Sequence, residues 1–432
     1  MILRLSDSIS RALGVIAACL IAAVMCYFAW RMALGAIAAE GQTPEQLRAA
    51  TRWEPRNSVY WYLRGHFEES NMERPDPAGA ASFLQTAVLL NPLYTDAWLE
   101  LANTHEIEGD LDEARRAYIR AEQSYPSSAE VAWRYGNFLL RTGDLPDAFV
   151  KLRSAVQADP QFAAAAYSRV YRADPNQDDI LEKVLPPIPR AYVAVIAEAT
   201  AAKQLAFAQI VWARLLALKP KLQVHDFDNL VYSLAANSEY AMAQRIWNQG
   251  ASTLSLPPLL QQQGSVVWDP SFESGVEGAT FSWHYQPLDQ GVRIGLDSNE
   301  KHSGGRSLRF AFDGKHNPGG DFACTWSAVN SVGQSYRFSA WIKAREVTTQ
   351  QGLRFRITSL GSKESSASTT QEFHGVLPWT LVEMPWTVGK DVYGVRICLS
   401  RDPSDNPDVR ISGSAWVDDV NLVPDALEPR RP

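Results

Sequence analysis

The sequence predicts a multidomain protein in which an all-α helical solenoid precedes an all-β sandwich of the jelly-roll type, with one N-terminal transmembrane helix. Three patterns predict this fold: a run without charge near the N-terminus, a 34-residue period after it, and period-two alternation beyond residue 265. The predicted boundaries are a cytoplasmic N-terminus at 1–11, a transmembrane anchor at 12–30, a solenoid at 42–254, a linker at 255–264, a sandwich at 265–424 and a tail at 425–432.

The transmembrane helix is predicted from Ala12–Trp30, nineteen residues without a charge. This length is enough to cross a bilayer. Arg4 and Arg11 precede the run, so the positive-inside rule favours a cytoplasmic N-terminus, with the bulk of the chain in the periplasm of a bacterium and the anchor in its inner membrane. The alternative is a signal peptide that is cleaved near Ala36–Ala38, although Arg31 would then lie just before the cleavage site.

The solenoid is predicted from residues that recur every 34 positions. Pro92, Pro126 and Pro160 share this spacing, and Gly109–Leu111 recurs as Gly143–Leu145. Alanines keep the same register at 80, 114 and 148 and again at 87, 121 and 155. Small alanines let two helices approach closely, glycine turns the chain between them, and proline ends the second helix. The pattern predicts five or six stacked helix pairs, with an irregular pair in the middle.

Residues 95–128 resemble the tetratricopeptide repeat, with Trp98 and Leu101 on the first helix and Ala114 and Tyr118 on the second. The resemblance implies a peptide-binding groove lined by the first helices: Trp61, Glu68, Asp96, Leu99, Asn103, Glu106, Trp133 and Asn137. Asn103 and Asn137 stand one period apart and would form an amide ladder for an extended peptide. Leu99 and Trp133 occupy places where a carboxylate clamp of this family needs lysine. We therefore expect a different peptide or protein partner.

The sandwich is predicted from short segments with period-two alternation: Ser307–Phe312, Tyr336–Lys343, Leu353–Ser359, Thr380–Thr387, Val392–Ser400 and Ala415–Leu422. Val267–Val423 is similar to carbohydrate-binding modules of families 4 and 9, which have the galactose-binding-like jelly roll. Asp269–Glu273 resembles their opening segment, Lys301–Leu308 a hairpin, Gly333–Trp341 a central strand, and Trp416–Val420 the closing strand. The resemblance implies a fold more than a ligand, because many such domains bind no sugar.

The same resemblance implies a structural calcium ion. It would be held by Glu273 and by Asp418 or Asp419, hard oxygen ligands that join the first strand to the last. The alternative is that these carboxylates are solvated or accept hydrogen bonds from backbone amides.

A glycan-binding face is predicted from strand alternation. Trp341 alternates with core residues on its strand, as do Arg354 and Arg356 on a second strand and Arg396 on a third. If these strands share a sheet, a tryptophan lies among arginines, which suits an acidic polysaccharide. The alternative is that the tryptophan is covered and the arginines only solubilise. Trp283, Trp379 and Trp386 are expected to pack in the core.

The cysteines leave one question open. Cys19 and Cys26 lie in the apolar run, and Cys324 and Cys398 lie in separate predicted strands. An oxidising periplasm permits a bridge between the latter two, but strand alternation disfavours it. We expect no metal site on any cysteine.

Composition excludes some functions. The 432 residues carry 41 basic and 48 acidic side chains, a net charge of −7, so nucleic acid is not an expected partner. Seven scattered histidines, with no nucleophile elbow and no phosphate-binding glycine loop, indicate that the protein is not an enzyme. We expect a scaffold or adaptor for envelope or exopolysaccharide assembly or export. The alternatives are a pure protein-interaction scaffold and an accessory module of a polysaccharide-acting enzyme.

Overall fold

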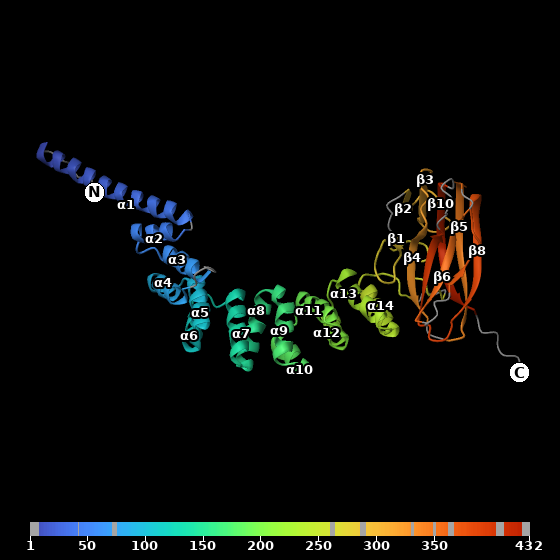
Figure 1. Cartoon of the computed structure of the whole chain (residues 1–432), viewed down its shortest axis with the longest axis horizontal. Coiled ribbons are helices and arrows are strands. Elements are labelled where there is room, and N and C mark those ends of the chain that lie inside the picture. Colours follow the sequence, from blue (N-terminus) through green and yellow to red (C-terminus); the bar gives the residue numbers. More distant parts are fainter. Residues whose placement is uncertain are drawn as a thin grey trace. The chain divides into compact units, whose positions relative to one another are not determined.

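The computed structural model of the chain describes residues 8–41, 43–70, 76–259, 264–285, 291–329, 332–348, 351–361, 367–402 and 410–425. The chain divides into two compact units, residues 1–191 and 192–432. Helices occupy the first unit and the start of the second, and two antiparallel sheets follow, which confirms the predicted fold class (Figure 1). The division falls inside α11 (Pro189–Ala201).

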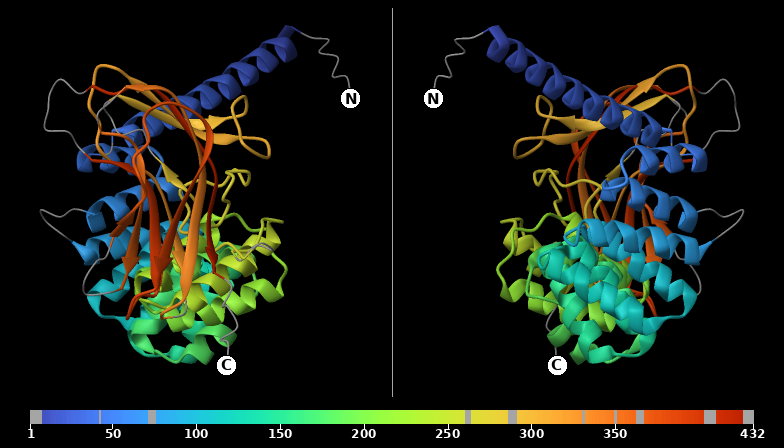
Figure 2. Two further views of the ribbon diagram at one scale, coloured as in Figure 1. Left: turned by 90° about the vertical axis from the view of Figure 1, so that its right-hand side faces the viewer. Right: turned by 90° about the vertical axis from the view of Figure 1, so that its left-hand side faces the viewer.

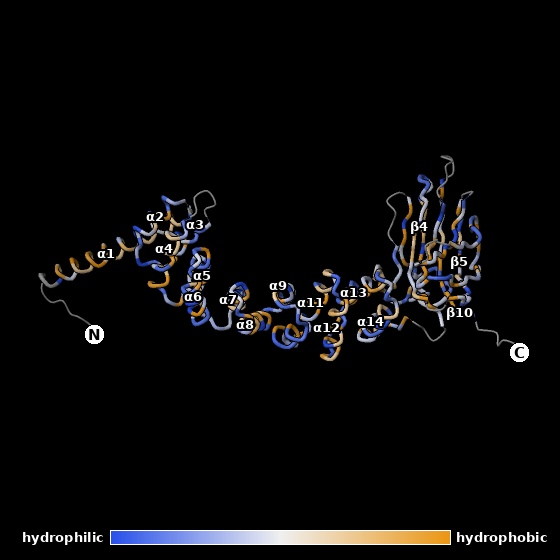
Figure 3. Tube along the Cα trace, turned by 60° about the horizontal axis from the view of Figure 1, so that its bottom comes forward, coloured by the Kyte–Doolittle hydropathy of each residue, from blue (hydrophilic) through white to orange (hydrophobic). Residues whose placement is uncertain are grey.

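Helix α1 (Ser8–Glu40) joins the apolar run to the repeats without a break. Its stretch Arg11–Glu40 is long and apolar enough to cross a membrane, and a signal sequence at the N-terminus has the same length and apolar character (Figure 3). Beyond Trp30 the helix packs on α2 (Pro44–Trp53): the Arg31 Nε donates to the Trp53 carbonyl at 2.9 Å. Gly35 is buried beside Tyr60, where an added Cβ would lie 3.1 Å from the ring. Figure 2 shows α1 as one helix that ends beside α2.

The next helices form the repeats of the first unit, and their bounds are α3 (Ser58–Ser70), α4 (Pro77–Leu90), α5 (Thr95–Glu108), α6 (Leu111–Ser124), α7 (Ala129–Thr142) and α8 (Leu145–Ala158). Gly109 and Gly143 end the first helices of two pairs with the same left-handed backbone, φ 83°. The recurring alanines at 80, 114 and 148 are fully buried between helices. Helices α7 and α8 approach so closely that there is no room for a side chain at Gly136, because a Cβ there would lie 2.9 Å from Leu152. The periodic pattern therefore predicted these pairs correctly.

The fourth pair is irregular, as expected. A short 3-10 turn at Pro160–Phe162 leads into α9 (Ala163–Ala173). Its partner is the brief α10 (Gln177–Asp179) followed by a π-helical turn, Ile180–Val184. The prolines at 175, 186 and 187 that flank this segment cannot continue a helix. The remaining helices are α11, α12 (Leu205–Ala217), α13 (His225–Ala236) and α14 (Tyr240–Thr253), and α13 packs against α14.

The last helix pair packs directly on the sandwich within the second unit. Trp247 of α14 meets Trp268 and Phe281 edge to face, and all three side chains are 0% exposed. Tyr240 stacks on Tyr393 with ring centroids 4.6 Å apart. Part of the predicted linker also packs against the sandwich, because the Trp268 indole donates to the Pro257 carbonyl at 2.9 Å. Residues 260–263 of that linker lie outside the described residues.

The sandwich consists of two five-stranded antiparallel sheets, ordered β1-β4-β9-β6-β7 and β2-β3-β10-β5-β8. Its strands are β1 (His284–Tyr285), β2 (Val292–Asp297), β3 (Ser307–Asp313), β4 (Gly320–Ala328), β5 (Ser335–Thr348), β6 (Arg354–Leu360), β7 (Ala367–Thr369), β8 (Gly375–Thr387), β9 (Gly394–Arg401) and β10 (Ser412–Pro424). All six predicted strand segments are present. The inward residues of both sheets form one core, which includes Phe310, Phe338, Phe355 and Ile397 as well as Trp283 and Trp386.

Cys324 and Cys398 form a disulfide, contrary to the expectation from strand alternation. The two residues lie directly opposite each other on β4 and β9, with Cα atoms 4.1 Å apart. Directly opposed residues of antiparallel strands bring their side chains onto the same face of the sheet. The alternation within each strand was not the deciding factor, because the pairing of β4 with β9 sets which residues meet.

Candidate functional site

The predicted groove residues lie on the face formed by the first helices, where side chains are tied between successive repeats. The Asn103 amide donates to the Glu69 carboxylate of the preceding repeat. The Asn137 amide donates to the Trp133 carbonyl at 2.7 Å and accepts from Arg169 of the following repeat. The two asparagines do not form a ladder that is open to a peptide, since both amides already have partners inside the solenoid.

Other predicted groove residues are divided among different environments. Leu99 is 3% exposed and belongs to the core. Trp133 stacks on Phe162 with ring centroids 4.8 Å apart, and Arg169 lies over its ring. Glu106 pairs with Arg141 at 2.6 Å. Asp96 and Glu68 lie near the surface without a described ion pair in the residues that the structure covers, and the Trp61 indole donates to the Pro55 carbonyl at 2.9 Å.

Glu69 and Glu100 form an acidic pair at the centre of this face. The pKa of Glu69 is raised to about 7, mainly because the carboxyl is buried and in addition because it forms a hydrogen bond with Glu100. Arg134 of the next repeat pairs with Glu100 at 3.1 Å. Glu69 is therefore mostly protonated below neutral pH, so it can share a proton with Glu100 and the pair avoids two buried charges.

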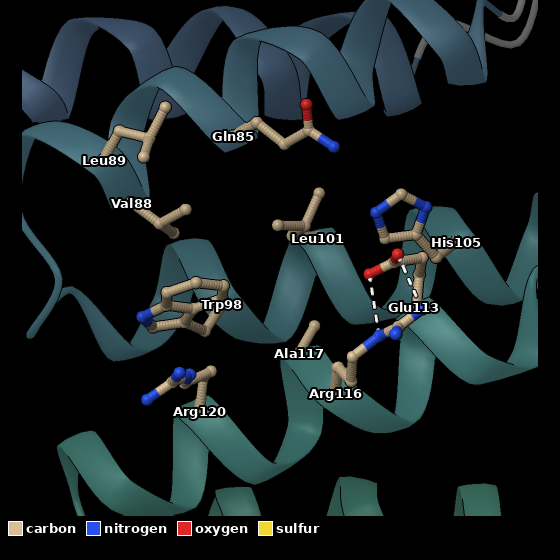
Figure 4. A pocket seen from close by; sticks show the side chains of 10 residues that line it. All are labelled: Gln85, Val88, Leu89, Trp98, Leu101, His105, Glu113, Arg116, Ala117 and Arg120. Atoms are coloured by element: carbon tan, nitrogen blue, oxygen red, sulfur yellow. Dashed lines mark hydrogen bonds and ion pairs between the residues drawn. The ribbon is translucent and has the colours of Figure 1, made fainter.

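An apolar pocket lies on the other side of α5, between the second helices α4 and α6 (Figure 4). Its cavity of about 330 Å³ is lined by Gln85, Val88, Leu89, Trp98, Leu101, His105, Glu113, Arg116, Ala117 and Arg120. Leu89 at its edge is 80% exposed. Exposed apolar side chains beside a concave apolar site are typical of a protein-interaction surface.

The rim of the pocket carries more positive than negative charge. Arg116 donates to Glu113 at 2.7 and 3.1 Å, so these two charges compensate each other. Arg120 has a contact only with the neutral Gln123, at 3.0 Å, among the described residues. This pocket was not predicted from the sequence, although two of its lining residues, Trp98 and Leu101, belong to the repeat pattern of the first helix.

The predicted glycan face is not formed as one surface, because its residues belong to different sheets. Trp341 lies on β5, in the sheet with β10 and β8. Arg354 and Arg356 on β6 and Arg396 on β9 lie in the other sheet. The condition that these strands share a sheet therefore fails, and the tryptophan and the arginines lie on opposite outer faces.

Trp341 is covered by a histidine. His302 stacks on it with ring centroids 3.8 Å apart, and the His302 ring meets Trp379 edge to face. A hydrogen bond of 2.7 Å between the His302 Nδ1 and the Asp419 carboxylate fixes the histidine ring in this position. This arrangement corresponds to the alternative in which the tryptophan is covered. Trp379 lies beside this stack at the surface and not in the core, where it was expected.

The arginines lie on the outer face of the first sheet, here called the β4–β9 face, with Trp326 and Asp321. Arg356 pairs with Asp402 at 2.7 Å and Asp321 at 3.3 Å, and Arg396 pairs with Asp321 at 3.1 Å. Arg354 pairs with Glu372 and Asp402. Three guanidinium groups are thus balanced by three carboxylates, and no excess of positive charge remains among them.

Trp326 is the aromatic side chain of the β4–β9 face. It is half-buried, with Arg396 over its ring and His284 against its edge at 4.6 Å between ring centroids. Across the sheet it lies opposite Arg396, which in turn lies opposite Thr358 of β6. The sequence signal for Trp326 was its alternation with Cys324, whereas Asp321 had no recognisable signal.

Two of the three predicted calcium ligands, Asp418 and Glu273, hold a hairpin through its backbone amides. Asp418 is fully buried and accepts from the amides of His302 and Ser303 at 2.8 and 3.0 Å. Glu273 accepts from the amides of Gly305 and Arg306 at 2.6 and 3.0 Å. Asp419 accepts from the Ser303 hydroxyl at 2.7 Å and from the Ser271 hydroxyl, and its carboxylate lies 2.7 Å from the His302 Nδ1. Oxygens that face N–H donors do not fit a cation, so this geometry favours the amide-bonded alternative, and calcium binding stays an untested prediction.

The family model of the tetratricopeptide repeat matches residues 72–123 and 108–161. Three solved structures are similar to parts of the chain. The crystal structure of MamA is 21% identical over 32% of this chain and 80% of that chain, with a TM-score of 0.28. A xylan-binding domain of carbohydrate-binding module family 22 is 14% identical over 38% of this chain and 96% of that chain, with a TM-score of 0.27.

The third is the structure of the CBM22-1–GH10 modules of Clostridium thermocellum xylanase 10B with xylohexaose, 16% identical over 37% of this chain, with a TM-score of 0.27. Only 28% of that chain is covered. No curated protein matches. Tetratricopeptide repeats are thus confirmed in the first half, and the C-terminal sandwich resembles carbohydrate-binding modules. At these identities and TM-scores the likeness is one of fold and does not identify a ligand.

Proposed function

We propose that the protein is a membrane-anchored scaffold, not an enzyme, that binds a protein partner through its repeats and a glycan through its sandwich. Its N-terminus would be cytoplasmic and the bulk of the chain periplasmic, at the inner membrane of a bacterium. A helical solenoid joined to a sandwich on a membrane anchor suits envelope or exopolysaccharide assembly or export. The continuity of α1 with the packing on α2 supports an anchor that is retained, because cleavage near Ala36–Ala38 would remove the Arg31 contact with Trp53.

The observation that carries the scaffold proposal is the apolar pocket between α4 and α6. Its floor is formed by Val88, Leu101 and Trp98, and Leu89 extends the apolar surface outward (Figure 4). Arg120 supplies the uncompensated charge of the rim. The matching occupant is a peptide segment that presents apolar side chains next to a carboxylate.

Selection of peptides from a displayed library on the full chain tests this proposal. We expect the selected peptides to carry leucine-like side chains beside Asp or Glu. Leu89→Ser should weaken their binding by about 10-fold, the loss of one apolar anchor, and Arg120→Gln should weaken only those with the acidic residue. Leu93→Ser is the matched control, because Leu93 is as exposed as Leu89 but does not line the pocket. An equal loss of peptide affinity in Leu89→Ser and Leu93→Ser would contradict peptide binding in the pocket.

The β4–β9 face favours a second activity, binding of a neutral glycan. Trp326 offers part of an apolar ring, and Arg396, Asp321 and Thr358 place donors and acceptors beside it. Because the three arginines are balanced by carboxylates, the face presents paired donors and acceptors to hydroxyl groups and no net charge for a polyanion. This differs from the acidic polysaccharide expected from the sequence, since the carboxylate partners were not foreseen.

A further inference from the structure

A cavity lies at the point where the apolar part of α1 ends and the repeats begin. It measures about 450 Å³, within the size range of ligand pockets. Phe28, Arg31 and Met32 line it from α1, and the segment from Trp53 to Asn57, which leaves α2, lines the rest. Both walls belong to the first unit, so the cavity is part of one packed body.

The position of the cavity along α1 places it at headgroup depth. Ala12–Trp30 rises about 28 Å at about 1.5 Å per residue, close to the thickness of the hydrocarbon core. Tyr27 and Trp30 stand at the end of this run, where aromatic residues mark the membrane interface. Trp30 meets Trp53 edge to face at 5.4 Å, so the wall formed by α2 lies at the same level.

The polar lining of the cavity suits a singly charged anion. Arg31 is held in place because its Nε and Nη2 donate to the Trp53 carbonyl, and its Nη1 carries two further N–H groups. Arg56 is exposed on the opposite wall. Glu54 also lines the cavity, but its Oε2 accepts from the Asn57 amide at 3.1 Å. Two guanidinium groups against one engaged carboxylate leave one positive charge.

We propose that this cavity binds the phosphodiester of a membrane glycerophospholipid. Guanidinium groups bind phosphate oxygens in a bidentate way, and a fixed Arg31 is already oriented for this. The acyl chains would run along the exposed Phe28 and Met32 toward the hydrocarbon core. The site rests on the membrane anchor proposed above, and it would fix the orientation of the first repeat relative to the bilayer surface.

The test is lipid retention by the full chain in detergent, measured by native mass spectrometry with dioleoylphosphatidylglycerol. We expect Arg56→Gln to lower retention about fivefold, the factor for one arginine near a lipid phosphate. Arg52→Gln is the matched control, because Arg52 is an exposed arginine in the last turn of α2 that does not line the cavity. Dioleoylglycerol, which has the same chains without phosphate, should not be retained.

Three outcomes would overturn the proposal: equal retention in the two variants, equal retention of dioleoylglycerol, or displacement of the lipid by millimolar inorganic phosphate. The last result would indicate a general anion site. The intact mass of the purified chain distinguishes failure of the lipid-site proposal from failure of the membrane-anchor proposal. If residues 1–38 are absent, the anchor proposal is wrong; if they are present and the variants behave alike, only the lipid site is wrong.

Discussion

The repeats and the sandwich stabilise their polar side chains over different distances along the chain. In the repeats, partners are about one period apart: Arg134 pairs with Glu100, 34 residues away, and Arg141 with Glu106, 35 residues away. In the sandwich, Asp418 holds the amide of His302, 116 residues away. A repeat therefore depends on its neighbours, whereas the sandwich depends on contacts that close only when the whole domain has folded.

The largest expected effect is loss of the disulfide. Replacing Cys324 and Cys398 together by alanine should destabilise the second unit by about 4 kcal/mol, the chain-entropy value for a crosslink that spans 74 residues. Urea unfolding followed by near-UV circular dichroism measures this effect. The repeats of the first unit should unfold at an unchanged urea concentration, and a parallel shift of both transitions would contradict the comparison.

Removal of the buried Asp418 carboxylate should have the next largest effect. Asp418→Ala leaves the amides of His302 and Ser303 without their acceptor, at a cost of about 3 kcal/mol. Asp313 is the matched control, because it accepts from the amides of Lys315 and His316 in an exposed hairpin, where water replaces it. Thermal melting should show a clearly smaller loss for Asp313→Ala, and equal losses would mean that burial is not the cause.

A smaller effect is expected in the repeats, from Glu69. Its raised pKa of about 7 means that the folded protein favours the protonated acid. The contribution of protonated Glu69 to the free energy of unfolding is therefore fully present below the ordinary glutamate pKa and is lost as the pH rises through 7. After allowance for solvent screening, this contribution is about 1 kcal/mol. The side chain of Glu69→Gln stays neutral at every pH. The melting temperature of the variant should therefore be higher than that of the wild type at pH 8 and equal to it at pH 4.5. Parallel melting curves at the two pH values would contradict this.

Calcium is expected to have the smallest effect. The oxygens of Glu273 and Asp418 already face backbone N–H donors, so EDTA should leave the melting temperature of the second unit unchanged. An increase on addition of millimolar CaCl₂, lost in Glu273→Gln, would instead establish the structural calcium ion that the family resemblance implies.

The same difference in range explains what the sequence could predict. The spacing of Pro92, Pro126 and Pro160 and the turns at Gly109 and Gly143 follow from local rules, so the helix pairs were correctly predicted. The strand segments also follow from a local pattern, the alternation of apolar and polar residues, and they were correctly predicted. Strand order is not a local property: Trp341 and Arg356 alternate in the same way on their strands, yet they lie in different sheets.

The candidate sites were harder to predict for a related reason. Asn103 and Asn137 stand at the expected positions, but their partners Glu69 and Arg169 occupy them. The disulfide depends on the pairing of β4 with β9, which no alternation within a strand reveals. Sequence periodicity locates a side chain on a face, whereas its neighbours on that face come from other elements.

The most direct measurement is binding of the full chain, in detergent, to dextran, galactomannan and alginate, by affinity electrophoresis. We predict retardation by a neutral polysaccharide that is lost in Trp326→Ala and in Arg396→Gln and is kept in Trp341→Ala, because Trp341 is covered by His302. Melting curves control for unfolding of the variants. Retardation by alginate alone, loss in Trp341→Ala but not in Trp326→Ala, or no retardation by any polysaccharide would contradict a glycan-binding role for the β4–β9 face.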